Sequence, residues 1–164
     1  MSEIKIKRID VANLVNVLAT MNGSYDNKLK YAIKRNKDLL SKEYAVIQAQ
    51  SQTKVEKFAE YENKRAALIN EYALRDEKGN MVFENQNSVK LQQDKVNEFN
   101  VKINDLSKEY EDTLKAKFEE EKIFRNYLQE EVDVTIYEID NSIIPSDIDQ
   151  EKYEILYNLV KVVE

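Results

Sequence analysis

The chain has 164 residues, of which 42% are hydrophobic and 34% are charged, and it contains only 2 glycines and 1 proline. This composition is typical of long solvent-exposed helices with narrow apolar seams, organised as a single domain. Because the chain has no cysteine and no histidine, it excludes disulfides, thiolate nucleophiles, imidazole bases and zinc sites of the usual Cys/His kind.

The amino-terminal residues predict a strand followed by a short helix. Isoleucine and lysine alternate in residues 4–7, and this period of two indicates a strand with one buried face. Asp10 is the expected N-cap of the helix. The run 22–24 is expected to end it, because Gly23 readily takes the left-handed conformation that closes helices.

Two long charged helices over residues 27–74 and 88–130 are predicted to fold back on each other. The second helix carries apolar residues at alternating spacings of three and four, namely Val96, Phe99, Ile103, Leu106 and Tyr110. This rhythm places them on one helix face, as in an antiparallel coiled coil. Asp26 is the expected cap of the first helix, and the glutamine-rich stretch 48–52 allows a local break or kink.

A turn is predicted over residues 75–87, between the two long helices. Gly79 supplies the positive φ that a tight turn needs, and residues 81–83 are expected to form the returning arm of a small β-ribbon. Asp76 and Glu77 could belong to an oxygen-rich metal loop, but their spacing fails the EF-hand pattern. Turn chemistry therefore explains these residues, and no metal is expected there.

The carboxy-terminal part predicts a strand and a final helix. Residues 132–139 are rich in β-branched and aromatic side chains, and their natural partner is the segment 4–9. Pro145 ends the next loop, and Asp147 or Asp149 is expected to cap the final helix. The predicted fold is mainly α (α+β), a single domain over 1–164. Its base comes from residues 1–26 and 131–164, with two short strands and two short helices, and a coiled-coil-like hairpin over 27–130 projects from it.

The order of these features resembles a family of small uncharacterised helical-hairpin proteins of tailed bacteriophages and prophages. The resemblance is carried by KYAIKRNKDLL at the start of the first long helix, DEKGN at the turn, EEVDVTIY at the strand and IPSDID before the last helix. It covers nearly the whole chain, in pattern more than in any rare motif. It implies a phage origin and a role in the cytoplasm of the infected host, and it brings no catalytic motif with it.

The best candidate for a ligand site is the basic stretch that opens the first long helix, formed by Lys30, Tyr31, Lys34, Arg35 and Lys37. In a helix the three lysines project together, with the tyrosine and the arginine on the neighbouring strip. Such a group could clamp a phosphate-bearing nucleotide through charge and ring stacking. The alternative is a solvated face that pairs with the acidic end of the second helix, residues 119–121 and 130–131.

These observations favour a non-enzymatic phage accessory protein that needs no cofactor. We expect it to bind and neutralise a host component, either an anti-phage defence protein, as an inhibitor, or a nucleotide immune signal, as a sponge. An inhibitor would use Met81, Val82 and Phe83 at the tip. The alternative function is a virion structural or assembly protein, such as a scaffold, tail-assembly chaperone or head-tail component.

The expected setting follows from charge and hydropathy. A net charge of -6 argues against general nucleic-acid binding. The apolar runs are too short for a signal peptide or a membrane span, so the expected location is the host cytoplasm, without membrane contact. Long charged hairpins suit packing into rings, so a homo-oligomer is expected.

Overall fold

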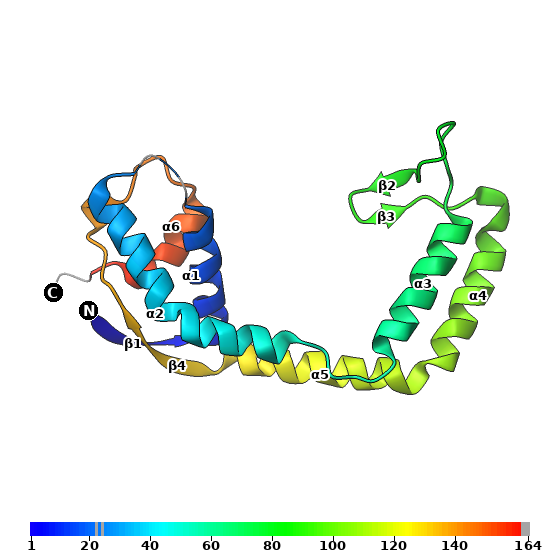
Figure 1. Ribbon diagram of the computed structural model, residues 1–164, viewed down its shortest axis with the longest axis horizontal. Helices are drawn as coiled ribbons and strands as arrows, with labels where there is room; N and C mark the ends of the chain where they lie inside the picture. The colour runs from blue at the N-terminus through cyan, green and yellow to red at the C-terminus, as the bar shows by residue number, and fades with distance from the viewer. Residues whose placement is uncertain (22, 24, 162–164) are drawn as a thin grey trace. The chain divides into compact units, whose positions relative to one another are not determined.

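A computed structural model describes residues 1–21, 23 and 25–161 of the chain (Figure 1). The fold is mainly helical, with two small two-stranded sheets, which confirms the mainly α class. The chain divides into two compact units: Met1–Gln52 with Lys122–Glu164, and Thr53–Glu121. The first unit therefore takes in more of the chain than the base expected from residues 1–26 and 131–164.

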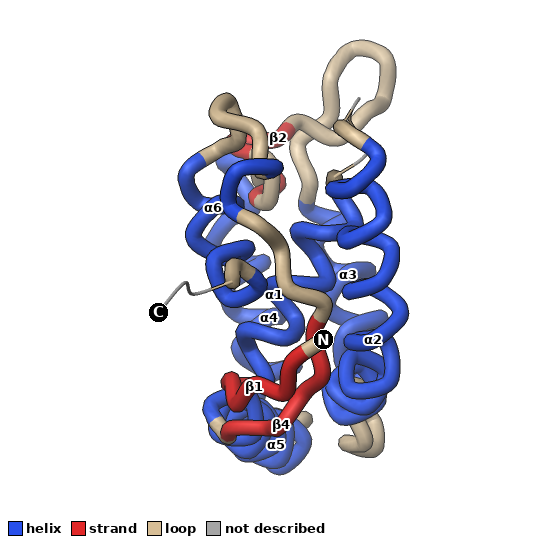
Figure 2. The backbone as a smooth tube through the Cα atoms, turned by 90° about the vertical axis from the view of Figure 1, so that its left-hand side faces the viewer, coloured by secondary structure: helices blue, strands red, loops and turns tan. Residues whose placement is uncertain are grey.

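The sheet of the first unit joins the two ends of the chain. Strand β1 (Ser2–Lys7) pairs antiparallel with β4 (Glu131–Ile136), with Ile4 opposite Val134 and Ile6 opposite Val132. Figure 2 shows the two strands side by side. The alternation of isoleucine and lysine predicts this pairing, because successive side chains of a strand point to opposite faces.

Three helices cover the core of this unit: α1 (Arg8–Thr20), α2 (Asn27–Ser51) and α6 (Gln150–Leu156). Fully buried leucines at 14, 18, 29, 40, 156 and 159 fill the space between them. Asp26 caps α2 by accepting a hydrogen bond from the Leu29 N–H at 2.8 Å, and Asp149 caps α6 in the same way. Both caps confirm the predictions from sequence.

The start of α1 differs from the prediction. The helix begins at Arg8, directly after β1, so Asp10 lies in its first turn and does not cap it. A carboxylate is also favourable there, because the helix dipole is positive at that end. Arg8 also holds the junction between β1 and α1 in place, because its guanidinium binds Glu43 at 3.0 Å and Glu130 at 2.7 Å.

The first predicted long helix is interrupted. Helix α2 ends at Ser51 and α3 (Phe58–Tyr72) begins after Lys57, which takes a left-handed conformation with φ of 63°. Between them, the Glu120 carboxylate accepts hydrogen bonds from the Thr53 hydroxyl at 2.7 Å and the Lys54 N–H at 2.6 Å. These contacts stabilise an extended connection where the sequence allowed a break.

The second predicted long helix is also interrupted. After a short 3-10 turn (Gln93–Lys95), α4 (Val96–Glu109) ends at Tyr110, and α5 (Glu111–Gln129) follows. Helices α3 and α4 pack on each other in opposite directions. An unbroken hairpin over 27–130 is therefore not confirmed, although an antiparallel helix pair lies within it.

The segment between α3 and α4 forms the predicted β-ribbon. Gly79 has φ of 82°, and the Asp76 carboxylate accepts hydrogen bonds from the backbone N–H groups of Lys78 and Asn80. Residues 75 and 81 form a bridge, and β2 (Phe83–Asn85) pairs with β3 (Ser88–Val89). Because the ribbon extends to residue 89, the next helix starts later than the predicted position 88.

The last part of the first unit returns the chain to the core. A 3-10 turn (Asn141–Ile143) follows β4, and a second one (Tyr157–Leu159) follows α6. The backbone of Ile139 then bonds to Leu159 and Lys161, which fixes the segment between β4 and the turn against the chain's end. Within the described ranges, no helix is both long enough and apolar enough to cross a membrane.

Candidate ligand-binding site

The five residues of the predicted ligand site all lie on the first half of α2. This helix buries Leu29, Ala32, Asn36 and Leu40 against the core, at spacings of three and four. Ile33 is buried as well, whereas Lys30, Tyr31 and Lys34 lie on the exposed side of the helix. The predicted site divides into two neighbouring faces of the same helix.

The first face, here called the lysine face, consists of Lys30, Lys34 and Lys37. The three side chains line a hollow of about 290 Å³, together with Met21, Gly23, Tyr25 and Ile33. Among the described residues, no carboxylate oxygen lies within 4.0 Å of these three ammonium groups. All the charged side chains that line this hollow are thus positive.

The acidic residues expected to neutralise this face have other partners. Glu130 binds Arg8 at 2.7 Å. Glu120 binds Lys117 at 2.8 Å and accepts the bonds from residues 53 and 54; these contacts lower its pKa to about 2, the bond from Lys117 most strongly. The lysine face therefore makes no ion pair with Glu130 or Glu131 of its own unit, which contradicts that part of the expectation. Its pairing with residues 119–121 of the other unit stays a prediction.

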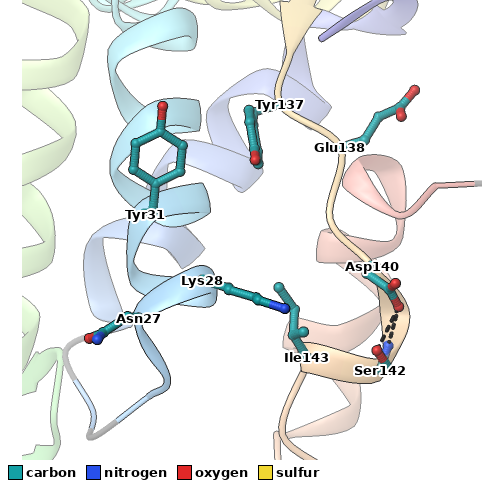
Figure 3. Close-up of a pocket in the computed structure, with 8 residues that line it drawn as sticks. All are labelled: Asn27, Lys28, Tyr31, Tyr137, Glu138, Asp140, Ser142 and Ile143. Atoms are coloured by element: carbon teal, nitrogen blue, oxygen red, sulfur yellow. Dashed lines mark hydrogen bonds between the residues drawn. The ribbon is translucent and has the colours of Figure 1, made fainter.

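The second face, here called the tyrosine pocket, contains Tyr31. Its ring is 58% exposed and meets the ring of Tyr137 edge to face, with centroids 5.4 Å apart. A cavity of about 510 Å³ lies here, lined also by Asn27, Lys28, Glu138, Asp140, Ser142 and Ile143. Figure 3 shows Lys28 extending from α2 toward Ile143, on the opposite wall. The pocket therefore offers one accessible aromatic ring and one ammonium group.

A buried amide holds the two walls of the tyrosine pocket together. Asn36 is fully buried; its side chain donates to the Tyr137 carbonyl and accepts from the Tyr137 N–H, both at 2.8 Å. The paired bonds fix the backbone of Tyr137 against α2, close to Tyr31. Sequence reasoning missed this residue, although one asparagine among the apolar positions of a helix is a visible signal.

The two carboxylates of the pocket are engaged by neighbouring hydroxyl groups. Asp140 accepts hydrogen bonds from the Ser142 hydroxyl at 2.7 Å and the Ser142 N–H at 2.9 Å. These bonds, with the charge of Lys28 as a smaller contribution, lower the pKa of Asp140. Glu138 accepts a hydrogen bond from the Ser2 hydroxyl. The ammonium group of Lys28 lacks an ion pair with any described residue.

Arg35 belongs to neither hollow. It is half-buried, and its guanidinium lies 3.7 Å from the Met1 sulfur, beyond the tyrosine pocket. The structure thus brings the three lysines together, places Tyr31 beside them with Tyr137, and leaves Arg35 at the margin. Within the described part of the chain, no three acidic side chains are grouped closely enough to hold a metal.

The predicted protein interface lies in the second unit. Residues 81–83 form the middle segment of the ribbon, where Val82 donates its N–H to Leu74 and accepts from Lys90. The Phe83 side chain is 58% exposed and Met81 is 36% exposed. Two large apolar side chains are thus exposed on a ribbon that backbone hydrogen bonds hold together.

The chain matches no protein-family model, no curated protein and no solved structure.

Proposed function

We propose that the protein acts by binding, and that its ligand is a small phosphate-bearing molecule with an aromatic ring. The supporting observation is the lysine face, where three ammonium groups line one hollow without a carboxylate partner among the described residues. Lysine binds phosphate as a compact point charge. The field of three lysines favours a ligand with more than one negative charge.

The tyrosine pocket supplies the contact for the ring. Tyr31 precedes Lys34 by three residues, so the two side chains are neighbours on the helix surface. A ring placed against Tyr31 leaves its phosphates within reach of Lys30 and Lys34, while Lys28 borders the other side. Stacking accepts any base, and the charges select for phosphate.

The resemblance to phage proteins gives this ligand a biological identity. Together with the absence of cysteine and histidine, it favours a non-enzymatic sponge that withdraws a nucleotide immune signal of the bacterial host. Binding alone accounts for such a role, because a sequestered signal cannot reach its receptor. The two hydrogen bonds between Asn36 and Tyr137 support this role, because they hold the tyrosine pocket in place and a preformed pocket needs less ordering when the ligand binds.

The test is calorimetry with mononucleotides, dinucleotides and cyclic dinucleotides at two salt concentrations. Wild type is expected to bind at least one class, more weakly as salt rises. Lys34→Glu should weaken that binding by at least about tenfold, because it reverses the central charge of the lysine face. Lys42→Glu is the matched control: Lys42 is exposed on α2 and lines neither hollow.

The proposal fails if no nucleotide class binds, or if Lys34→Glu binds as tightly as Lys42→Glu. Arg35→Glu discriminates further. Arg35 lines neither hollow, but it follows Tyr31 by one helical turn. A loss equal to that of Lys34→Glu would therefore place the phosphates over the tyrosine pocket instead.

A protein inhibitor is the second candidate, favoured by the exposed Phe83 and Met81 on the ribbon. Phe83→Ser should abolish capture of a host protein while leaving nucleotide binding unchanged. A virion or assembly role remains the alternative from the sequence pattern. Detection of the protein in purified particles would support that role, and its absence from them would oppose it.

A further inference from the structure

Helices α3 and α4 carry the same pattern of residues. At one constant sequence offset, Glu60, Lys64, Leu68, Glu71 and Tyr72 correspond to Glu98, Lys102, Leu106, Glu109 and Tyr110. Aromatic residues also correspond at 61 and 99. The two helices are therefore two copies of one residue pattern.

The contacts between the helices repeat as well. The Tyr72 hydroxyl donates to Glu98 at 2.5 Å, and the Tyr110 hydroxyl donates to Glu60 at 2.5 Å. In both copies the lysine one turn after the glutamate lies over the tyrosine ring, 5.0 Å and 4.8 Å from its centroid. Corresponding contacts in antiparallel copies define an approximate two-fold axis between α3 and α4.

A groove lies on this axis. Its volume is about 420 Å³, and its lining consists of four corresponding pairs: Lys64 and Lys102, Ala67 and Asp105, Leu68 and Leu106, Glu71 and Glu109. Leucine side chains form part of the floor. Each end carries one ion pair, at 2.9 Å between Lys64 and Glu109 and at 3.4 Å between Lys102 and Glu71.

The second unit has little core to support it. Its buried cluster consists of Tyr61, Leu106 and Tyr110, with four partly buried apolar side chains packed against them. A stable helical domain buries apolar faces between layers, and one helix pair leaves its outer faces uncovered. A further layer over the groove would bury the half-buried Leu68 and cover the alkyl stems of Lys64 and Lys102.

We propose that this groove is the interface with a second copy of the chain, so that two α3–α4 pairs form a four-helix bundle. An isologous interface pairs one surface with itself, so the surface must be self-complementary. The two ends of the groove meet this condition in charge, while Asp105, which corresponds to Ala67, adds one unmatched carboxylate between them. Because each end holds one lysine and one glutamate, any face-to-face two-fold pairing places two lysines and two glutamates together. No end collects charges of one sign alone.

The test compares the same substitution at two adjacent positions on each helix. Ala67 and Asp105 line the groove, whereas Ala66 and Asn104 are equally exposed and lie outside it. Sedimentation velocity over a concentration series should show wild type, Ala66→Arg and Asn104→Arg forming dimers. Ala67→Arg and Asp105→Arg should weaken dimerisation by at least about tenfold each, because an arginine obstructs close packing at the axis.

Circular dichroism confirms that each variant is folded, and either groove variant suffices if the other fails to fold. A wild-type chain that stays monomeric at every concentration would overturn the proposal and leave the groove to a different protein. Equal dimerisation of Ala67→Arg and Ala66→Arg would overturn it too, because the dimer would then form elsewhere.

Discussion

The two compact units are stabilised by different interactions. In the first, sixteen buried apolar side chains of the described chain form one cluster, and Arg8 makes two ion pairs. In the second, the buried cluster has three members. Exposed lysine and glutamate side chains pair between its helices, and the hydroxyl groups of the buried Tyr72 and Tyr110 donate to glutamates of the facing helix. Burial of apolar area is the larger contribution to folding, since exposed ion pairs contribute about 0 to 1 kcal/mol each. The first unit should therefore be the more stable.

The largest expected effect comes from emptying the core of the first unit. Leu40 is fully buried there, so Leu40→Ala should lower the free energy of unfolding by about 3 kcal/mol, as transfer and cavity costs add. In the second unit Leu68 is only half-buried, so Leu68→Ala should lower the free energy of unfolding by about 1 kcal/mol. Urea unfolding with probes in each unit measures both. Equal losses would contradict the contrast between the units.

The next effect concerns the buried amide. Asn36→Ala leaves the N–H and C=O of Tyr137 without their partners, which should cost about 2 kcal/mol. It should also weaken nucleotide binding, because Tyr137 is no longer fixed beside Tyr31. Unchanged nucleotide binding in a folded Asn36→Ala protein would show that binding does not depend on the hydrogen bonds between Asn36 and Tyr137.

A smaller effect tests whether the corresponding residues of α3 and α4 are equivalent. Tyr72→Phe and Tyr110→Phe each remove one hydroxyl bond to a glutamate. Both should reduce the stability of the second unit by similar amounts, less than Leu40→Ala reduces that of the first. Each should also raise the lowered pKa of its glutamate, Glu98 or Glu60, which NMR titration detects. A large difference between the two variants would contradict the approximate symmetry.

The smallest effect is a difference in response to acid. Hydrogen bonds lower the carboxyl pKa values of Glu60, Glu98 and Glu120 in the second unit, that of Glu120 to about 2 from 4.5. A lowered pKa in the folded state stabilises the fold fully above the unfolded value and loses this contribution as the pH falls through the folded value. Protection from hydrogen exchange, measured relative to the intrinsic rate at each pH, should therefore fall in the second unit first, between about pH 5 and 2. Simultaneous opening of both units would contradict this.

Local signals in the sequence predict a substantial part of this fold. Alternation predicts the pairing of β1 with β4, and the aspartates at 26 and 149 and the glycine at 79 predict two caps and a turn. The glutamine-rich stretch 48–52 allows a break in the first long helix, but the structure of that break and the interruption of the second helix escape such reasoning. They depend on contacts between distant residues, such as Glu120 with Thr53 and Tyr110 with Glu60, while the local propensities favour continuous helix.

The candidate site shows the same division. Helical spacing places the three lysines on one face, because their spacing of four and three is local. The tyrosine pocket depends on Tyr137 and Asn36, which are 101 residues apart, and no local pattern joins them. The correspondence between α3 and α4 is visible in the sequence as five identical residues at one constant offset, whereas the apolar stripe of the second helix carries no sign of it.

The most direct test of the proposed function is native mass spectrometry after incubation with a small-molecule extract of phage-infected bacteria. Wild type and Lys42→Glu should each retain the mass of one phosphate-bearing molecule per binding site, and Lys34→Glu should retain none. The same spectra report whether the chain is a dimer. If all three proteins retain nothing, or all three retain the same molecule, the lysine face is not the binding site and the account of α2 is wrong.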